Sequence, residues 1–130
     1  MINSSRIMNA QAITGIFGRM LTFNGSELLN VQIKRDGPTL FIELSTKEMV
    51  KNKPKRWNEW DIVYVEMSFF GVRDLEINSF GTMNEIKQFA MEDIGEEGSI
   101  KIQCSNKMSI ACLFDWARVE KINPGLIGTP

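Results

Sequence analysis

The sequence predicts a mainly β protein, built as a single antiparallel, strongly curved sheet, a half-barrel or a sandwich of about seven to eight strands, with a short N-terminal helix. Most of the chain alternates apolar and polar residues with a period of two, which is typical of half-buried strands. Turn signals such as Asp-Gly and Glu-Glu-Gly separate the alternating segments. With 130 residues and 43% hydrophobic residues, the chain (1–130) is expected to form one domain around one core.

The first expected element is a short amphipathic helix over residues 9–20. Its apolar residues recur at helical spacing behind Asn9, whereas two glycines weaken it. These apolar residues are Ile13, Ile16, Phe17 and Met20. The stretch FGRMLTFNGSELL (residues 17–29) then contains Asn24-Gly25, a pair that tolerates the positive φ of a tight corner. We therefore expect Phe23 to pack inward at a corner that leads into the first strand.

An antiparallel β meander is expected over residues 27–122, and it begins with a hairpin. Asp36-Gly37 lies between the alternating runs ELLNVQIK and TLFIELST, which is the strongest short-range hairpin signal. The register that follows places every apolar side chain of the two strands on one face. Its pairs are Ile33 with Leu40, Val31 with Ile42, and Leu29 with Leu44.

Residues 46–60 lose the alternation and form the longest irregular connection. The strand pattern returns in residues 62–70, with Val63, Val65, Met67 and Phe69 on one face and Tyr64, Glu66, Ser68 and Phe70 on the other. Gly71 breaks this run before a fourth strand over residues 72–78. Residues 82–94 fit either a helix capped by Thr82 and Glu85 or a short strand, and we favour the strand.

The last three strands are expected over residues 99–105, 108–114 and 116–122, after a turn at Glu96-Glu97-Gly98. Placing Ile100, Ile102 and Cys104 on the same face as the apolar residues of the next strand requires a three-residue loop or a bulge near Asn106-Lys107. Cys104 would then lie opposite Ile110 and not opposite Cys112, so no disulfide is expected. Residues 123–130 are expected to be a fraying tail.

The composition argues against most catalytic chemistry. The chain has no histidine, which removes the usual general base, the Ser-His and Cys-His pairs and the imidazole zinc sites. It has two cysteines without a C-x-x-C spacing, and no glycine-rich phosphate loop. We expect no catalytic, cofactor-binding or metal-binding residues. Four strand carboxylates remain as candidates for acid–base work, although most are expected on the wet face of the sheet: Glu43, Glu66, Asp74 and Glu76.

The net charge and the hydropathy of the chain also limit the classes of partner that we expect it to bind. The formal net charge is -1, from 15 basic and 16 acidic residues, so nothing draws the whole protein to nucleic acid or to an anionic membrane. No stretch approaches the roughly 20 apolar residues that span a bilayer, and no signal peptide is evident in the first 18 residues. A cytoplasmic protein without nucleic-acid or membrane partners is therefore expected.

The basic loop KNKPKRWNEW has three interpretations. Its tryptophans can stack on nucleic-acid bases while lysines hold phosphates. They can fold back to cap the core, or they can act with arginine as anchors for a protein partner. The residues concerned are Lys55, Arg56, Trp57 and Trp60.

The order of these features resembles the immunity protein 50 family of bacterial polymorphic toxin systems. The resemblance rests on RDGPTLFIEL, then Pro-Lys-Arg-Trp, then VYVEMSFFGVRDLEINSFGT and a closing pair of strands that ends in VEKI, and it spans residues 17–122. Members often carry a His-Asp-like pair where this chain has Asn24-Gly25, so a function that depends on that pair is not expected here. The resemblance implies a non-enzymatic protein that binds and neutralises a cognate protein toxin, and it implies no cofactor.

The expected mechanism is occlusion of the toxin by one face or edge of the sheet together with the long loop. Lys55, Arg56, Trp57 and Trp60 are the expected toxin-binding residues, and replacing the two tryptophans with alanine is expected to weaken binding with little loss of stability. The near-neutral charge does not support a nuclease target. A homodimer through a sheet edge is also compatible with the sequence. Two rivals remain: a small-ligand carrier lined by Met67, Phe69 and Met108, and a carboxylate enzyme.

Overall fold

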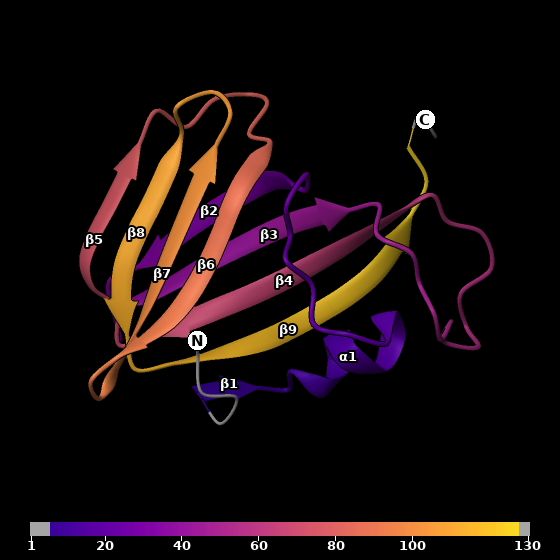
Figure 1. The fold of residues 1–130 in the computed structure, drawn as a ribbon, viewed down its shortest axis with the longest axis horizontal. Helices are drawn as coiled ribbons and strands as arrows, with labels where there is room; N and C mark the ends of the chain where they lie inside the picture. Colours follow the sequence, from indigo (N-terminus) through magenta and orange to yellow (C-terminus); the bar gives the residue numbers. More distant parts are fainter. Residues whose placement is uncertain (1–5, 128–130) are drawn as a thin grey trace.

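The structure is a computed structural model that describes residues 6–127. Two sheets face each other, and their strands cross (Figure 1). The first sheet has five strands in the order β1-β9-β4-β3-β2, and the second has four in the order β5-β8-β7-β6. The bounds are β1 Ile7–Met8, α1 Gln11–Phe17, β2 Glu27–Lys34, β3 Thr39–Thr46, β4 Ile62–Phe70, β5 Arg73–Asn78, β6 Ile86–Ile94, β7 Glu97–Cys104, β8 Ser109–Phe114 and β9 Trp116–Gly125.

Of the three predicted architectures, the sandwich matches, whereas the single curved sheet and the half-barrel are wrong. The predicted continuous meander is also interrupted, because the chain leaves the first sheet after β4, builds the second sheet from β5 to β8 and returns as β9 beside β4. In addition, β1 pairs with β9 in parallel. The physical reason is burial: folding the second sheet over the first covers the apolar faces of both.

The N-terminal helix is shorter than the predicted 9–20. It ends at Gly18, whose φ of 80° is left-handed and whose N–H donates to the Thr14 carbonyl at 2.8 Å. Asn9 does not cap the helix, because its side-chain amide donates to the Val119 carbonyl of β9 at 3.0 Å. Ile13 and Phe17 are buried, so the helix closes the core beside β9 (Figure 1).

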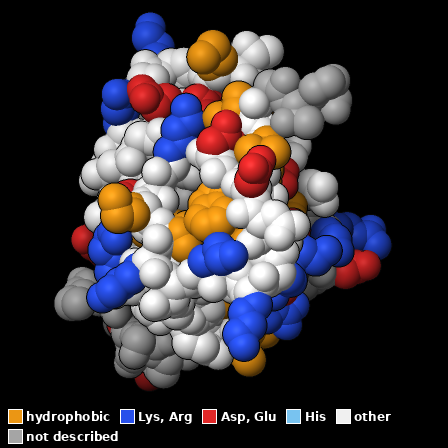
Figure 2. Space-filling model, turned by 90° about the vertical axis from the view of Figure 1, so that its right-hand side faces the viewer, with side chains coloured by type: hydrophobic (Ala, Val, Ile, Leu, Met, Phe, Trp, Pro, Cys, Tyr) orange, Lys and Arg blue, Asp and Glu red, His pale blue; other side chains and the backbone are white. Residues whose placement is uncertain are grey.

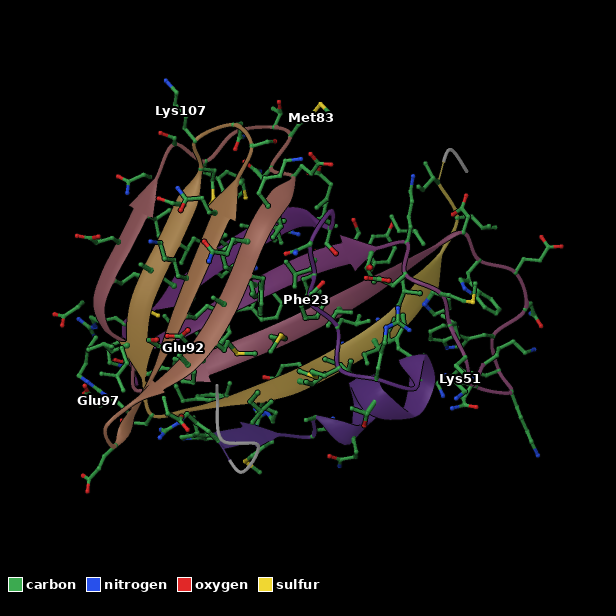
Figure 3. The ribbon with its side chains drawn as sticks, in the orientation of Figure 1. Phe23, Lys51, Met83, Glu92, Glu97 and Lys107 are labelled. Atoms are coloured by element: carbon green, nitrogen blue, oxygen red, sulfur yellow. The ribbon has the colours of Figure 1, made fainter. Side chains whose placement is uncertain are left out.

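The predicted corner before β2 is confirmed. Gly25 has a φ of 85°, and its N–H donates to the Ile86 carbonyl at 2.8 Å. Phe23 is fully buried and points in between the sheets, where its ring centroid lies 4.8 Å from that of Phe89 on β6 (Figure 3). The Asn-Gly pair therefore has a structural role, namely joining the start of β2 to the start of β6.

The β2–β3 hairpin has the predicted register near the turn and a different one away from it. Ile33 pairs with Leu40 and Val31 pairs with Ile42, as predicted. Leu44, however, faces Leu28, because a β-bulge between Leu28 and Asn30 shifts the register. The prediction of a single apolar face is therefore wrong for Leu29, which is 38% exposed.

The second sheet confirms the strand predicted within residues 82–94 and corrects one turn and one strand register. Ile94 pairs with Glu97, so the turn is Gly95-Glu96 and not Glu96-Glu97-Gly98; Gly95 supplies the positive φ, at 62°. The predicted three-residue loop between β7 and β8 is present, with Lys107 at a φ of 72°. Cys104 lies opposite Met108 and not opposite Ile110, since its N–H donates to the Met108 carbonyl at 2.9 Å.

The predicted tail begins later than expected. Asn123, Pro124 and Gly125 belong to β9 and pair with Tyr64, Val63 and Ile62 of β4. The last three residues, 128–130, lie outside the described residues. Among residues 6–127, no helix is long and apolar enough to cross a membrane.

Candidate functional site

The loop between β3 and β4 holds the four residues predicted to bind a partner. Lys55 and Arg56 are exposed. Trp57 is 1% exposed and belongs to the core, which is the capping interpretation of this tryptophan. Trp60 is half-buried and packs edge-on against Trp57, with ring centroids 5.4 Å apart.

Hydrogen bonds to α1 determine this arrangement of the loop. The backbone N–H groups of Lys51 and Asn52 both donate to the Ile16 carbonyl, at 3.0 and 2.9 Å, and the Asn52 side-chain amide donates to the Gly15 carbonyl at 2.9 Å. Lys51 accordingly lies beside the helix in Figure 3. Figure 2 shows this end of the molecule, where basic side chains, with acidic ones above, lie around a central hydrophobic patch.

The outer face of the five-stranded sheet, which points away from the second sheet, forms a second candidate site. β3, β4 and β9 direct alternate side chains to it, and Tyr64, Glu66, Ser68 and Phe70 lie there as the sequence predicts. An open groove of about 420 Å³ runs over this face. The groove residues used below are Lys34, Phe41, Glu66, Phe70, Arg118, Glu120 and Lys121.

Arg118 is the centre of this groove. Its guanidinium carbon lies 5.1 Å from the ring centroid of Phe70 and 5.8 Å from that of Trp116, and the two rings stack with centroids 4.1 Å apart. Arg118 also donates from Nε and Nη2 to the two carboxylate oxygens of Glu120, at 2.6 and 3.1 Å. Ser68 Oγ donates to the same carboxylate at 2.8 Å, so the cluster is held at several points.

This network shifts the acid–base equilibria of its members. The Arg118 hydrogen bonds lower the pKa of Glu120, partial burial opposes that change, and the Ser68 hydrogen bond reinforces it. The hydrogen bond to Glu120 likewise raises the pKa of Arg118. Both groups are therefore charged at neutral pH, and the guanidinium stays fixed over the two rings.

The residues of this cluster were not singled out as a site from the sequence. Arg118 and Trp116 alternate within the last strand, and Phe70 ends the fourth, but no local pattern shows that β9 returns to lie beside β4. A pairing of Phe70 with Trp116 requires that return. The enrichment of the outer positions in aromatic residues was visible, and it is the one signal that pointed to this face.

Two of the four candidate carboxylates are cross-strand neighbours, and the other two lie in the other sheet. Glu43 and Glu66 are paired on β3 and β4, on the outer face, whereas Asp74 and Glu76 lie on β5 in the other sheet. Within the described residues, no group of three or more His, Cys, Asp or Glu side chains is placed to hold a metal ion.

The side chains proposed to line a ligand cavity lie in the core. Met67, Phe69 and Met108 are each fully buried between the sheets. Phe69 packs edge-on against Phe114 of β8, with ring centroids 5.0 Å apart. These three residues therefore join the two sheets by apolar contact.

The family comparison covers nearly all of the described fold. A family model described as Immunity protein 50 matches residues 9–125, from two residues before α1 to the end of β9. No curated protein and no solved structure matches the chain. The match agrees with the resemblance inferred from the sequence and spans both sheets. The chain belongs to the immunity protein 50 family.

Proposed function

We propose that this protein is a non-enzymatic immunity protein of a bacterial polymorphic toxin system, which binds a cognate toxin in the cytoplasm and neutralises it by occlusion. Membership of the immunity protein 50 family supports the role. The structural observation that supports this mode of binding is the Arg118 cluster on the outer face of the five-stranded sheet. This role involves contact-dependent competition between bacteria and needs neither nucleic acid nor a cofactor.

The outer face has the composition of a protein-binding surface. Arginine, tryptophan and tyrosine are the commonest energetic anchors of interfaces, and a half-buried Arg118 over Phe70 and Trp116 presents such anchors already positioned. Because Glu120 and Ser68 hold the guanidinium in place, little side-chain entropy remains to be lost on binding.

The predicted loop residues extend the same surface. Arg56 lines a hollow with Glu120 and Lys121, which also line the outer-face groove. Lys55 and Arg56 are therefore proposed as rim contacts that speed association, whereas Arg118 and its rings are the anchors. Of the two tryptophans, half-buried Trp60 is the one that a partner can reach without opening the core.

The test uses the toxin encoded beside this protein and the variant Arg118→Ala. The affinity for the toxin should fall at least about tenfold, which corresponds to roughly 1.4 kcal/mol. Lys101→Ala, on the exposed face of the other sheet, removes the same charge and should leave affinity unchanged. Equal affinity of Arg118→Ala and wild type, with both folded, would exclude the outer face as the binding site.

The rim is tested separately. Lys55→Ala combined with Arg56→Ala should slow association at low salt and change dissociation little, because exposed charges act mainly on the encounter. Stopped-flow binding at two salt concentrations measures this. Pairing of two copies through the β2 edge would leave Arg118 accessible, because β4 and β3 separate β9 from β2.

A further inference from the structure

One edge of the five-stranded sheet is only partly covered. β2 is the last strand of that sheet, and the segment Asn84–Ile86 bonds only to its beginning: the Leu28 N–H donates to the Asn84 carbonyl at 3.0 Å, and the Ile86 N–H donates to the Ser26 carbonyl at 2.7 Å. Beyond the bulge at Leu29, residues 30–34 pair only with β3 among the described strands. An open strand edge is a template for pairing with another strand.

Apolar side chains accompany this free edge. Ile33 is 56% exposed and Phe80 is 48% exposed, and with Val31 and Ile77 they line an open hollow of about 220 Å³. The hollow lies where the edges of the two sheets, β2 and β5, come together. Exposed apolar side chains beside an unpaired edge indicate a surface that another chain covers.

We propose that a second copy of this chain covers it, through antiparallel pairing of the two β2 strands about a two-fold axis at Gln32. A strand that pairs with its own copy in this way is centred on the middle residue of its free segment, and Gln32 is the middle of residues 30–34. Val31 then lies opposite the partner's Ile33, and Ile33 opposite the partner's Val31. The two five-stranded sheets join into one continuous sheet.

Charge complementarity selects a second copy over another strand. Glu43 faces Glu66 across β3 and β4, and Lys121 of β9 is the cross-strand neighbour of Glu66 on its other side, so Glu43 is the carboxylate of the two without a basic residue opposite it; the Asn30 side-chain amide donates to Glu43. Within residues 6–127, neither carboxylate nor Lys34 forms an ion pair.

The two-fold pairing supplies a cation to Glu43. It places the partner's Lys34 opposite Asn30, two strand spacings, roughly 10 Å, from Glu43 on the same outer face. The side chains of lysine and glutamate together span that gap. By symmetry the contact forms twice, so each copy places a lysine near Glu43 of the other.

Analytical ultracentrifugation of the purified protein over a dilution series, without toxin, tests this dimer independently of the proposed function. Lys34→Glu and Glu43→Lys should each raise the dimer dissociation constant at least about tenfold. The double variant should recover most of the dimer affinity that each single variant loses. Lys101→Glu, with the same charge change on the other sheet, should have no effect. A wild type that is monomeric throughout the series, or a double variant as weak as the single ones, would overturn the proposal.

A disulfide cross-link tests the register. Gln32→Cys places two thiols opposite each other across the axis, within the range in which disulfides form, so oxidation should give a covalent dimer on a non-reducing gel. Gln103→Cys, exposed on β7, is the control and should remain monomeric on the gel. A wild-type dimer combined with failure of Gln32→Cys to cross-link would place the interface elsewhere and overturn the proposal. Pairing at this edge only when the toxin is present would do the same.

Discussion

The indole ring of Trp57 packs edge-on against that of Trp60, with 71° between the ring planes. Trp57 is 1% exposed and Trp60 is half-buried, so the pair runs from the core to the surface. The long loop between β3 and β4 is therefore anchored by an apolar side chain, although its sequence is basic and irregular. This anchoring separates the residues that stabilise the loop from those that are free to meet a partner.

Trp57→Ala should destabilise the fold strongly. Removing a fully buried tryptophan leaves a cavity and costs about 3–5 kcal/mol. Among residues 6–127, the indole N–H of Trp57 has no hydrogen-bond partner, so no polar contact within this part of the chain is lost with the ring. Urea unfolding followed by circular dichroism measures the free energy of unfolding.

Two variants serve as comparisons for Trp57→Ala. Trp60→Ala should cost less, because its ring is only half-buried, and Met49→Ala, at a side chain that is 78% exposed, should change stability by less than about 0.5 kcal/mol. An unchanged stability of Trp57→Ala would contradict this packing. The structure thus reverses the sequence-based expectation that both tryptophans can be replaced with little effect on stability.

Two glycines should respond to alanine in opposite directions. Gly71, between β4 and β5, has a φ of 71°, and an added Cβ would come within 2.2 Å of the Asp115 carboxylate. Gly71→Ala should therefore lower the free energy of unfolding by about 1–3 kcal/mol. Gly15, inside α1, has no atom within 4 Å of an added Cβ, so Gly15→Ala should raise it by about 0.5–1 kcal/mol. Thermal unfolding of both variants checks the signs, and a stable Gly71→Ala would show that the corner tolerates a side chain.

Local sequence patterns correctly predicted the structural features that depend on residues close together in the chain. The Asp36-Gly37 turn fixed the pairing of Ile33 with Leu40, and alternation placed Phe70 on the outer face. Local patterns failed where one extra residue changes the register, as at Leu29 in the bulge, because an inserted residue leaves no mark on the alternation itself.

Long-range pairing could not be predicted from the sequence. The return of β9 beside β4 depends on the packing of two whole sheets, and this return assembles Phe70, Trp116 and Arg118. The candidate loop shows the same limit, since Trp57 is 1% exposed and belongs to the core cluster although the sequence of its loop is basic and irregular. The sequence showed that both sites are rich in aromatic residues. It did not show which of these residues are buried in the core and which can contact a partner.

The two cysteines should react slowly in the folded protein. Both thiols are free and buried, and burial raises the pKa of Cys112 to about 11 and raises that of Cys104. Because the thiolate is the reactive form, iodoacetamide at pH 8 should label neither site appreciably without denaturant and both in urea. Mass spectrometry counts the labels. Rapid labelling of native protein would indicate that β7 and β8 open readily.

Glu120, on the outer face, should make the free energy of unfolding of the protein depend on pH. Its pKa is lowered in the folded state, chiefly by the hydrogen bonds from Arg118, so the folded protein binds this proton less tightly than the unfolded chain does. A lowered folded-state pKa stabilises the fold fully above the ordinary glutamate range, roughly pH 4–4.5, and this contribution disappears as the pH falls through the lowered value. Glu120→Gln removes the titrating group, so its stability should lie furthest below that of wild type at pH 7 and approach it at pH 3. Glu96→Gln, in the exposed β6–β7 turn, is the control for the loss of one exposed carboxylate. A constant gap between Glu120→Gln and wild type across this range would mean that the Glu120 carboxylate contributes through packing and not through its charge.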